Sequence, residues 1–327
     1  MSISYVKLDG LLTREGNDLV LDYRGLAKRL TKEQAKYQPE IGSHPHLVRQ
    51  WLLACNVFPP KWINRIFSVG GIKWVGDQLY LLAYTYADLQ QDDDYRAAQT
   101  EHKTGAARIE VLYEDEHLLV VNKPAGMPVH GANKGQRNSL DVAVAVHMLR
   151  HNDPIIIRHI HRLDDDTSGP VLYAKNELSQ QRLDEQMRNK EIDRQYIAIV
   201  HGRLRSKKGT ISEPIGKDRH QPKRRIITPK GESAITHYEL LEAGELYSIV
   251  KLELETGRTH QIRVHMSHIR HPLVGDYLYG GNTELLNHQA LHGASLSLIH
   301  PITGEKLVVE AQPPAWYAEI KQHITKS

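Results

Sequence analysis

Apolar and polar residues alternate along this chain in patterns that predict strands interspersed with helices. The segments PVLYAKN (170–176) and RQYIAIVHGRL (194–204) have the apolar content or the two-residue alternation of strands. Helical spacing occurs in SLDVAVAVHML (139–149), where Ser139 is suited to cap the first turn, and in LSQQRLDEQMRN (178–189). Because there is no strict βαβ repeat, we predict an α+β fold with a central mixed, largely antiparallel sheet flanked by helices.

Other segments have the pattern of strand pairs joined by short turns. IEVLYEDEHLLVVNKPAG (109–126) has two apolar runs around an acidic turn, and residues 233–257 have two around an Ala-Gly turn. Nearer the N-terminus, LVRQWLL (47–53) suits a helix, and PPKWINRIF (59–67) predicts a helix that begins at proline and ends at a glycine pair. IKWVGDQLYLL (72–82) predicts a hairpin with a Gly-Asp turn.

A polar segment separates these two regions of the chain. Residues 90–107 carry a run of charges and show no apolar periodicity, which predicts a linker. A length of 327 residues is enough for about two domains. The predicted division is a small N-terminal domain (1–89), the linker (90–107) and a larger domain (108–327).

Composition narrows the classes of protein to which the chain can belong. A single cysteine, Cys55, excludes a disulfide framework and a cysteine-based zinc site. The N-terminus has no apolar core of signal-peptide length, and no run approaches the roughly 18 apolar residues that a membrane helix requires. We therefore expect a cytoplasmic protein without membrane contact.

Positive charge is concentrated in the second half of the chain, although the formal net charge is only +3. Residues 203–230 contain ten Lys and Arg against two acidic residues, and residues 258–271 contain three Arg and four His. One such segment would be read as a solvated loop, but two together favour contacts with nucleic-acid phosphates.

The stretch IHRLDDDTSG (160–169) holds three consecutive carboxylates, Asp164, Asp165 and Asp166. Side chains alternate in an extended segment, so Asp164 and Asp166 could converge on Mg²⁺. Arg162 would lie on the same side, however, and its charge opposes a metal cation. We favour one working carboxylate, Asp164, at the end of a strand, held ionised by a guanidinium. The other two would be solvated or cap a Thr-Ser-Gly turn with local hydroxyl-to-backbone bonds.

HRLDDDTSG resembles the HRLDxxTSG signature of the RluA family of RNA pseudouridine synthases. Further segments resemble motifs of this family in the family's order: 111–130, 194–202, 256–266, 271–281 and 288–305. The resemblance implies an enzyme that isomerises specific uridines to pseudouridine in structured ribosomal or transfer RNA. It implies neither a metal nor an organic cofactor, and we expect a monomer.

The resemblance also assigns catalytic residues. Asp164 matches the family's aspartate, which would attack C1′ of the ribose or remove the 2′ proton. Tyr196 matches a tyrosine that would stack on the uracil ring; the alternative is an ordinary core tyrosine. Arg263 matches the basic residue that pairs with the aspartate. Arg258 competes for this role, and the two arginines, five positions apart, would face opposite sides of a strand.

Contacts with RNA follow from the same resemblance. The residues expected to bind the substrate are His161, Arg162, Arg258 and Gln261. Residues 203–230 are predicted to be a mobile loop that orders on RNA and grips it through Lys223, Arg224 and Arg225. Residues 59–79 resemble an S4 RNA-binding module, in which Lys61, Arg65 and Lys73 would face phosphates. The alternative is a small structural cap with solvated charges.

Two other functions remain open at this point. The chain could be an RNA-binding protein that keeps the fold without catalysing, although the set of Asp164, Tyr196 and Arg263 argues against it. It could also be a metal-dependent phosphotransfer enzyme that uses Asp164 to Asp166. The histidines of residues 258–271 have no accompanying cysteine or convergent carboxylate, so we expect them to face RNA or the core rather than a metal.

Overall fold

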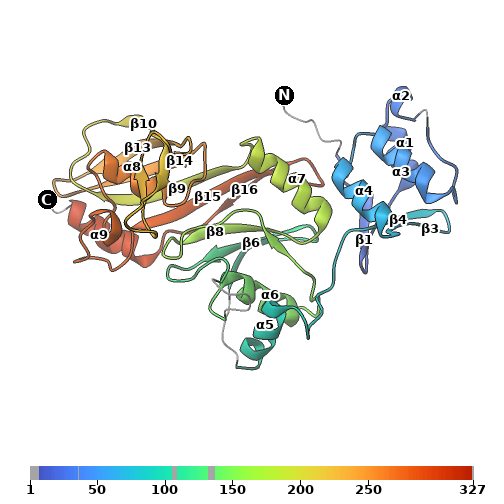
Figure 1. Ribbon diagram of the computed structural model, residues 1–327, viewed down its shortest axis with the longest axis horizontal. Coiled ribbons are helices and arrows are strands. Elements are labelled where there is room, and N and C mark those ends of the chain that lie inside the picture. The colour runs from blue at the N-terminus through green and yellow to red at the C-terminus, as the bar shows by residue number, and fades with distance from the viewer. Residues whose placement is uncertain (1–6, 36, 105–108, 132–136, 326–327) are drawn as a thin grey trace.

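The fold is described from a computed structural model, which covers residues 7–35, 37–104, 109–131 and 137–325. Figure 1 shows an elongated molecule with the N-terminal elements at one end and α9 at the other. No described helix is both long enough and apolar enough to cross a membrane.

The N-terminal part is a four-stranded antiparallel sheet, in the order β1-β2-β4-β3, with its helices packed beside it. Trp51 and Trp62 are fully buried at the centre of its core. The predicted helices and the hairpin turn between Val75 and Gln78 are confirmed. The elements are β1 (Leu12–Glu15), β2 (Asp18–Leu21), α1 (Tyr23–Arg29), α2 (Lys32–Ala35), α3 (Pro45–Ala54), α4 (Pro60–Ser68), β3 (Ile72–Val75) and β4 (Gln78–Leu82).

The larger part contains a six-stranded sheet, β10-β13-β14-β9-β15-β16, and a four-stranded sheet, β5-β6-β8-β7. Every ladder between described strands is antiparallel, so the prediction of largely antiparallel pairing is confirmed. The strands are β5 (Glu110–Glu114), β6 (Leu118–Lys123), β7 (Arg158–His159), β8 (Gly169–Ala174), β9 (Asp193–His201), β10 (Lys208–Ser212), β11 (Ile215–Lys217), β12 (Arg225–Ile227), β13 (Ile235–Ala243), β14 (Tyr247–Leu254), β15 (Leu291–Ile299) and β16 (Lys306–Glu310).

Helices flank these sheets, as the α+β prediction requires. Ser139 caps the first helix after β6, because its Oγ accepts a hydrogen bond from the backbone N–H of Val142 at 3.3 Å. The helices are α5 (Asp93–Thr104), α6 (Leu140–Arg150), α7 (Glu177–Arg188), α8 (Gln261–His268) and α9 (Ala315–Thr325), with a short 3₁₀ helix, η1 (Tyr277–Tyr279).

The predicted linker, residues 90–107, is mostly a helix. Asp93–Thr104 forms α5, whose Tyr95 and Ala98 are buried against α6. The Tyr95 hydroxyl donates a hydrogen bond to the carbonyl of Ile155 at 2.5 Å. The linker prediction is wrong here because three apolar residues on a highly charged segment give too weak a periodicity to read. Its last residues, 105–107, lie outside the described residues.

The prediction of a mobile loop over residues 203–230 is also wrong for much of that segment. It contains β10 and the two-stranded sheet β11-β12, in which Ile215 pairs with Ile227 and Lys217 with Arg225. The side chain of Ile215 is buried with Tyr279 and other residues in a small apolar cluster. Short apolar stretches between the charges therefore fold the segment against the rest of the chain.

Contacts between the two parts of the chain are extensive. One apolar core includes buried residues of the N-terminal helices together with residues of α5, α6 and α7. Arg14 forms a bidentate ion pair with Asp153 at 2.6 and 2.7 Å. The fully buried Arg182 of α7 donates a hydrogen bond to the carbonyl of Val57 at 2.6 Å. The N-terminal part is thus docked on the larger part rather than tethered to it.

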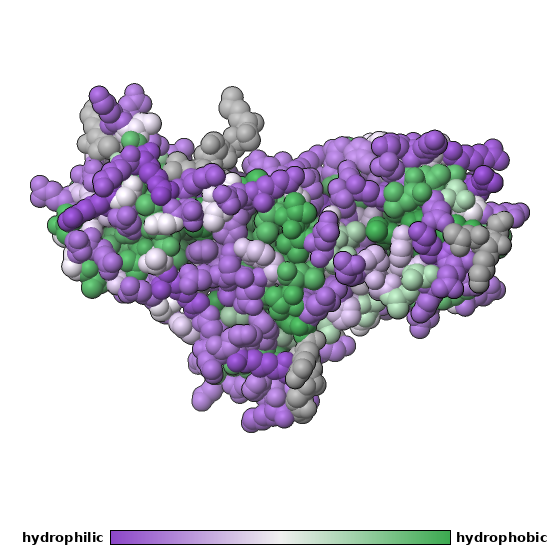
Figure 2. All heavy atoms as spheres, turned by 180° about the vertical axis from the view of Figure 1, so that it is seen from behind, coloured by the Kyte–Doolittle hydropathy of each residue, from purple (hydrophilic) through white to green (hydrophobic). Residues whose placement is uncertain are grey.

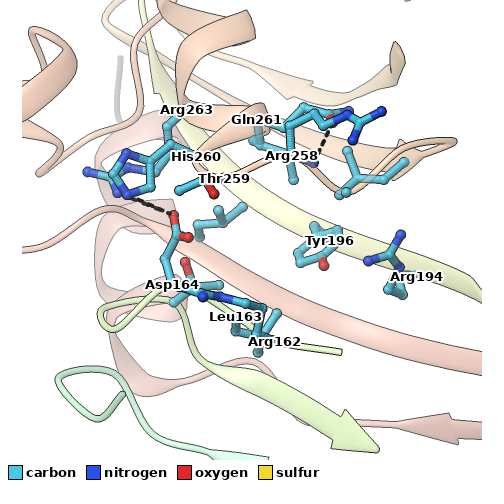
Figure 3. A pocket seen from close by; sticks show the side chains of 15 residues that line it. Arg162, Leu163, Asp164, Arg194, Tyr196, Arg258, Thr259, His260, Gln261 and Arg263 are labelled. Atoms are coloured by element: carbon cyan, nitrogen blue, oxygen red, sulfur yellow. Dashed lines mark hydrogen bonds and ion pairs between the residues drawn. The ribbon is translucent and has the colours of Figure 1, made fainter. Parts of the chain in front are cut away.

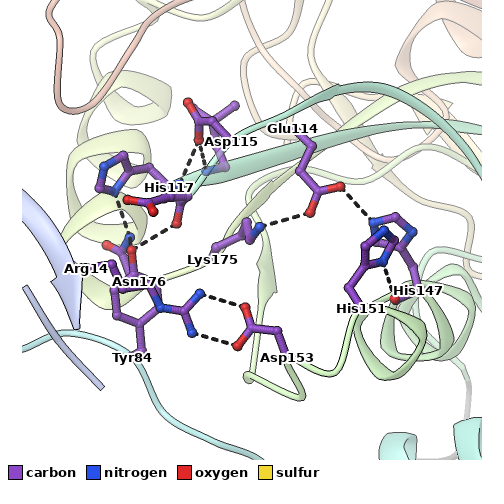
Figure 4. Close-up of polar contacts among 12 residues, drawn as sticks. Arg14, Tyr84, Glu114, Asp115, His117, His147, His151, Asp153, Lys175 and Asn176 are labelled. Carbon is purple, nitrogen blue, oxygen red and sulfur yellow. Dashed lines mark hydrogen bonds and ion pairs between the residues drawn. The ribbon is translucent and has the colours of Figure 1, made fainter. Parts of the chain in front are cut away.

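Figure 4 shows a polar network where β5, α6 and β8 meet. Glu114 accepts hydrogen bonds from His147 at 2.8 Å and from Lys175 at 2.9 Å. The bond from His147, with the added charge and bond of Lys175, lowers the pKa of Glu114 to about 2, although burial opposes this shift. The carboxylate therefore stabilises the fold in its ionised form.

Replacing Glu114 with Gln is expected to lower the free energy of unfolding by about 2 kcal/mol at pH 7. The pKa of Glu114 is lower in the folded state than in the unfolded chain, so its contribution is present above about pH 4.5 and is lost as the pH falls toward 2. Urea unfolding at pH 7, 5 and 3.5 measures the difference. The exposed neighbour Glu116, changed to Gln, is the matched control. A destabilisation of equal size at pH 7 and pH 3.5 would contradict the prediction.

Candidate active site

Asp164 lies in the loop between β7 and β8, at the centre of the larger part. Its carbonyl accepts a hydrogen bond from the backbone N–H of Thr167 at 3.0 Å, which closes a turn. The prediction that Asp164 ends a strand is therefore wrong, because the residue begins the turn. Its side chain is 19% exposed and points toward α8 (Figure 3).

The buried Lys123 anchors this loop through hydrogen bonds to backbone carbonyls. Nζ of Lys123 donates hydrogen bonds to the carbonyls of Asp165 at 2.7 Å and Met127 at 2.6 Å. Burial lowers the pKa of Lys123 to about 8. Asp165 thus contributes its backbone to the loop while its side chain is exposed to solvent.

Strand β15 holds the other side of the loop. Gly169 has φ of +128°, and a Cβ there would come within 2.6 Å of Gly293, so a side chain is excluded at the crossing. The hydroxyl of Ser168 is 2.9 Å from Nδ1 of His292, and the hydroxyl of Thr167 accepts a hydrogen bond from Gln289. The hydroxyls therefore bond to distant side chains, and the predicted local hydroxyl-to-backbone bonds are wrong.

Arg263 connects the Asp164 loop to a second carboxylate. Its Nη1 lies 3.2 Å from Oδ2 of Asp164, while Nε and Nη2 donate to Asp276 at 2.7 and 2.9 Å. Burial disfavours the charged guanidinium, but the two carboxylates outweigh it and raise the pKa of Arg263. Asp276 is buried and fixes the fork geometry of the arginine.

Arg263 lies on a helix, α8, and not on a strand as expected. Arg258 lies in the loop before this helix, where its Nε donates to the carbonyl of Ser233 and its Nη1 pairs with Glu232. Figure 3 shows Arg258 turned away from Asp164. Of the two arginines, Arg263 is thus the one that contacts Asp164, and it does so from a helix rather than through strand alternation.

Tyr196 lies on β9, with its ring in the same pocket as Asp164 (Figure 3). It is 5% exposed, and its backbone pairs with Leu252 on one side and Gly293 on the other. Burial raises the pKa of the phenol, so the ring is neutral at physiological pH. Arg194, two residues earlier on the strand, lines the same pocket.

The pocket has a volume of about 90 Å³, below the roughly 300–1,000 Å³ typical of ligand sites. A larger groove of about 980 Å³ adjoins it and shares part of its wall. Five Lys and Arg residues line the groove, Arg162, Arg188, Lys190, Arg194 and Arg258, together with three acidic residues, Asp193, Glu253 and Glu255. The two hollows together offer a small pocket beside a larger groove in which basic residues outnumber acidic ones.

The four residues expected to bind substrate divide into two pairs. Arg162 and Arg258 are exposed and line both the pocket and the groove. His161 is buried, and its Nε2 accepts a hydrogen bond from the backbone N–H of Leu172. Gln261 is buried, and its amide bonds to Thr256, Arg258, Ile235 and Thr236. His161 nevertheless lines the groove and Gln261 the pocket, so their contact with substrate stays a prediction beside these internal bonds.

The residues expected to grip RNA lie in two separate places. Lys223 is exposed, Arg224 lies 5.8 Å from the centre of the Tyr279 ring, and the guanidinium of Arg225 bonds to carbonyls of its own hairpin. In the N-terminal part, Lys61 and Lys73 are exposed. Arg65 instead pairs with Glu177 at 2.7 Å, which fixes it against α7.

Three residues of the site were missed by the sequence interpretation. Asp276 holds Arg263, His260 faces Asp164, and Tyr279 contacts both His260 and the guanidinium of Arg263. Asp276 and Tyr279 lie within residues 271–281, one of the segments that resemble family motifs, but nothing in their spacing shows that they meet Arg263. Within the described parts of the chain, no group of three or more side chains is arranged to hold a metal ion.

Comparison with known proteins places this site in a family. Residues 117–268 match the RNA pseudouridylate synthase family. The chain is 49% identical to "Uncharacterized RNA pseudouridine synthase YhcT" of Bacillus subtilis, over 63% of this chain and 69% of that protein. It is 35% identical to "Ribosomal large subunit pseudouridine synthase D" of Yersinia pestis, over 90% of both chains.

Solved structures agree on the fold. The structure titled "Human RNA Pseudouridylate Synthase Domain Containing 4" has a TM-score of 0.56 at 22% identity, covering 71% of this chain and 98% of that chain. "Human RNA Pseudouridylate Synthase Domain Containing 1" has a TM-score of 0.55 at 23% identity. The sequence identities, the fold and the segments quoted above agree, and the chain belongs to the RluA family of RNA pseudouridine synthases, which isomerise uridine to pseudouridine in RNA.

Proposed function

We propose that this enzyme modifies uridines of large-subunit ribosomal RNA and that Asp164 is the carboxylate that acts at the ribose. One observation carries the role of Asp164: among the described residues lining the pocket, it is the only carboxylate, and Arg263 contacts it. The choice of ribosomal RNA is supported by relatives named as large-subunit enzymes, including one aligned over 90% of this chain.

The reaction moves the glycosidic bond from N1 to C5 of the same base. The enzyme must therefore break a C–N bond, hold the free uracil, turn it and rejoin it. On our proposal Asp164 either attacks C1′ or removes the 2′ proton, and the contact with Arg263 directs its carboxylate. The ring of Tyr196 offers a flat, neutral surface against which the uracil can stack and turn.

A uridine inside a stacked helix cannot reach Asp164, so the target nucleotide has to be flipped out of its strand. We propose that the base enters the small pocket while the flanking strand follows the adjoining groove. Arg162 and Arg194 line both hollows and are suited to hold the phosphates on either side of the flipped nucleotide. The β11-β12 hairpin, with Lys223 exposed near its turn, would contact RNA on the far side of α8.

Replacing Lys223 with Ala is expected to weaken RNA binding about 3- to 10-fold and to reduce the salt dependence by about one phosphate contact. Because a lysine–phosphate contact carries no sequence information, the loss should be equal for all RNAs that bind. Filter binding across a range of salt concentrations measures both quantities. Lys306, exposed on β16, is the control when replaced with Ala. Unchanged affinity and salt slope in the Lys223 variant would show that the hairpin does not contact RNA.

We propose that residues 1–89 form an S4-like RNA-binding domain, with the larger domain beginning at α5. The support is the order of basic helix, glycine turn and hairpin in α4, β3 and β4, with Lys61 and Lys73 exposed. Arg65 is left out of this proposal because it pairs with Glu177. Since the substrate is RNA, we propose that the enzyme works in the cytoplasm.

Incubation of the purified protein with unmodified transcripts tests the substrate. The transcripts are large-subunit ribosomal RNA, small-subunit ribosomal RNA and a pool of transfer RNAs, each mapped for pseudouridine afterwards. We expect pseudouridine at defined positions of the large-subunit transcript alone. Pseudouridine only in transfer RNA would overturn the choice of substrate but not the reaction. Pseudouridine in none of them, together with tight binding, would favour a binding protein that keeps the fold.

A further inference from the structure

His260 has a left-handed backbone conformation, which only a few per cent of non-glycine residues adopt. Its φ of 59° and ψ of 20° lie in the left-handed region, at the residue before α8. Asn56, Asn152, Lys190 and Arg270 also have positive φ, so the place of the ring beside the pocket, and not the backbone alone, points to a role for His260. The ring of His260 lines the pocket that contains Asp164.

The two ring nitrogens of His260 face different partners. Nδ1 lies 2.8 Å from the hydroxyl of Tyr279, and Nε2 lies 3.9 Å from Oδ2 of Asp164. The Nε2 distance is slightly longer than a hydrogen bond. The imidazole is therefore held at one nitrogen while the other faces the carboxylate of Asp164 without touching it.

The hydroxyl of Tyr279 is placed to share a hydrogen bond with Nδ1 of His260. It accepts a hydrogen bond from the backbone N–H of Arg225 at 2.9 Å, and a backbone N–H can only donate. The single proton of the phenol is then free to be donated to Nδ1 of His260. With that proton donated to Nδ1, the neutral imidazole carries its own proton on Nε2, directed toward Asp164.

We propose that His260 is a positioning residue for Asp164, oriented through Tyr279 by the backbone of the β11-β12 hairpin. When RNA binds against the hairpin, the gap between Nε2 and Oδ2 closes and the carboxylate gains a second donor beside Arg263. The reactive oxygen of Asp164 then has a defined direction. This inference rests on the proposed role of Asp164. It adds His260 as the group that couples RNA binding to the direction of the Asp164 carboxylate.

The surroundings of the ring support a neutral imidazole. Burial lowers the pKa of His260, and nearby arginines add to this effect while carboxylates oppose it. The charged groups that face it come from the Asp164 loop, from β12, from α8 and from the residue before η1: Asp164, Arg225, Arg263 and Asp276. Tyr279, from η1, is the neutral hydroxyl among them.

Protonation of His260 would break the arrangement. Nδ1 would become a donor, and the phenol would have to turn its O–H away from the ring and accept from Nδ1 as well as from the N–H of Arg225. Activity should therefore fall at acidic pH as the imidazole takes up a proton. Removing the hydroxyl of Tyr279 removes a bond to the neutral ring, which raises the pKa of His260 and moves this loss of activity to higher pH.

The test uses RNA from cells that lack this protein and were grown with uridine tritiated at C5. Isomerisation replaces the C5–H bond, so tritium release measures the reaction whichever RNA is the substrate. The variants are His260→Asn, since Asn tolerates the left-handed backbone, and Tyr279→Phe. The control is Tyr277→Phe, which changes an exposed tyrosine of the same short helix. Thermal unfolding of each variant shows whether it remains folded.

We expect His260→Asn to lower kcat about 10- to 100-fold, the effect of a small misplacement of a reacting group, with the half-saturating RNA concentration unchanged. Tyr279→Phe should lower kcat less and shift the acidic limb of the pH profile upward, and Tyr277→Phe should match the wild type. A folded His260→Asn protein with wild-type kcat, or a Tyr279→Phe profile without a shift, would overturn the inference. If Asp164→Asn were inactive at the same time, the proposed function would still hold. No release by the wild type would overturn both.

Discussion

An Asp164→Asn variant is expected to fold normally and to lose isomerase activity by about 10⁴-fold or more, as when an enzyme loses a reacting side chain. Asparagine has nearly the shape of aspartate, and its amide oxygen can still accept the hydrogen bond from Arg263. It cannot attack C1′ or take up the 2′ proton. The loss should therefore appear in kcat, with little change in RNA affinity, and tritium release from C5-labelled RNA measures it.

The matched control is Asp165→Asn, one position later. The side chain of Asp165 is exposed, while its carbonyl, which accepts the bond from Lys123, is unaffected by the substitution. This variant should keep at least half of the wild-type activity. If Asp165→Asn were as inactive as Asp164→Asn, the three aspartates would be acting together, and the metal-dependent alternative would return to consideration.

An Asp276→Asn variant is expected to lose about 3–5 kcal/mol of stability and most of its activity, because it breaks a buried ion pair. The side chain of Asp276 has no exposure and that of Arg263 is 9% exposed, so neither charge can turn to solvent. The amide N–H of asparagine would face the N–H groups of the arginine. Arg263 would then move, and Asp164 would lose its fixed direction.

Urea unfolding measures the stability of this variant, and tritium release its activity. The comparison pair is Asp93 and Arg96, an exposed ion pair on α5. Asp93→Asn should change the free energy of unfolding by no more than about 0.5 kcal/mol, because exposed pairs are screened by water. A similarly small change for Asp276→Asn would show that Asp276 does not anchor Arg263.

Much of the fold could be predicted from local pattern. The α6 helix has a capping serine and apolar spacing, and β9 alternates, so both could be read directly from the sequence. Helix α5 could not, because its burial depends on a few small or aromatic residues that pack on α6. The strands between residues 215 and 227 could not be predicted either, because their few apolar residues stand among many charged ones.

The candidate site could be predicted only in part. Asp164, Tyr196 and Arg263 were chosen through resemblance to a family, and the structure brings all three to one pocket. The partners that hold them were not found. Asp276 follows Arg263 by 13 positions, and the pairing depends on how η1 packs against α8. The position of the His260 ring depends on a left-handed backbone conformation, which cannot be predicted from the residue type.

The N-terminal charges show a second limit of sequence reasoning. Arg65 and Lys61 look alike in sequence, as exposed basic residues of one helix. The structure separates them, since Arg65 meets Glu177 of α7 across the boundary between the two parts. Whether a surface charge faces solvent or a neighbouring domain is decided by docking, which local patterns do not encode.

The most direct test of the account is pseudouridine mapping of RNA from cells that lack this protein, complemented with wild type or with Asp164→Ala. We predict that defined pseudouridines disappear from large-subunit ribosomal RNA without the protein, return with the wild type and stay absent with the variant. Restoration of the sites by Asp164→Ala, or no lost site in any RNA, would contradict the claim that this chain makes pseudouridine through Asp164.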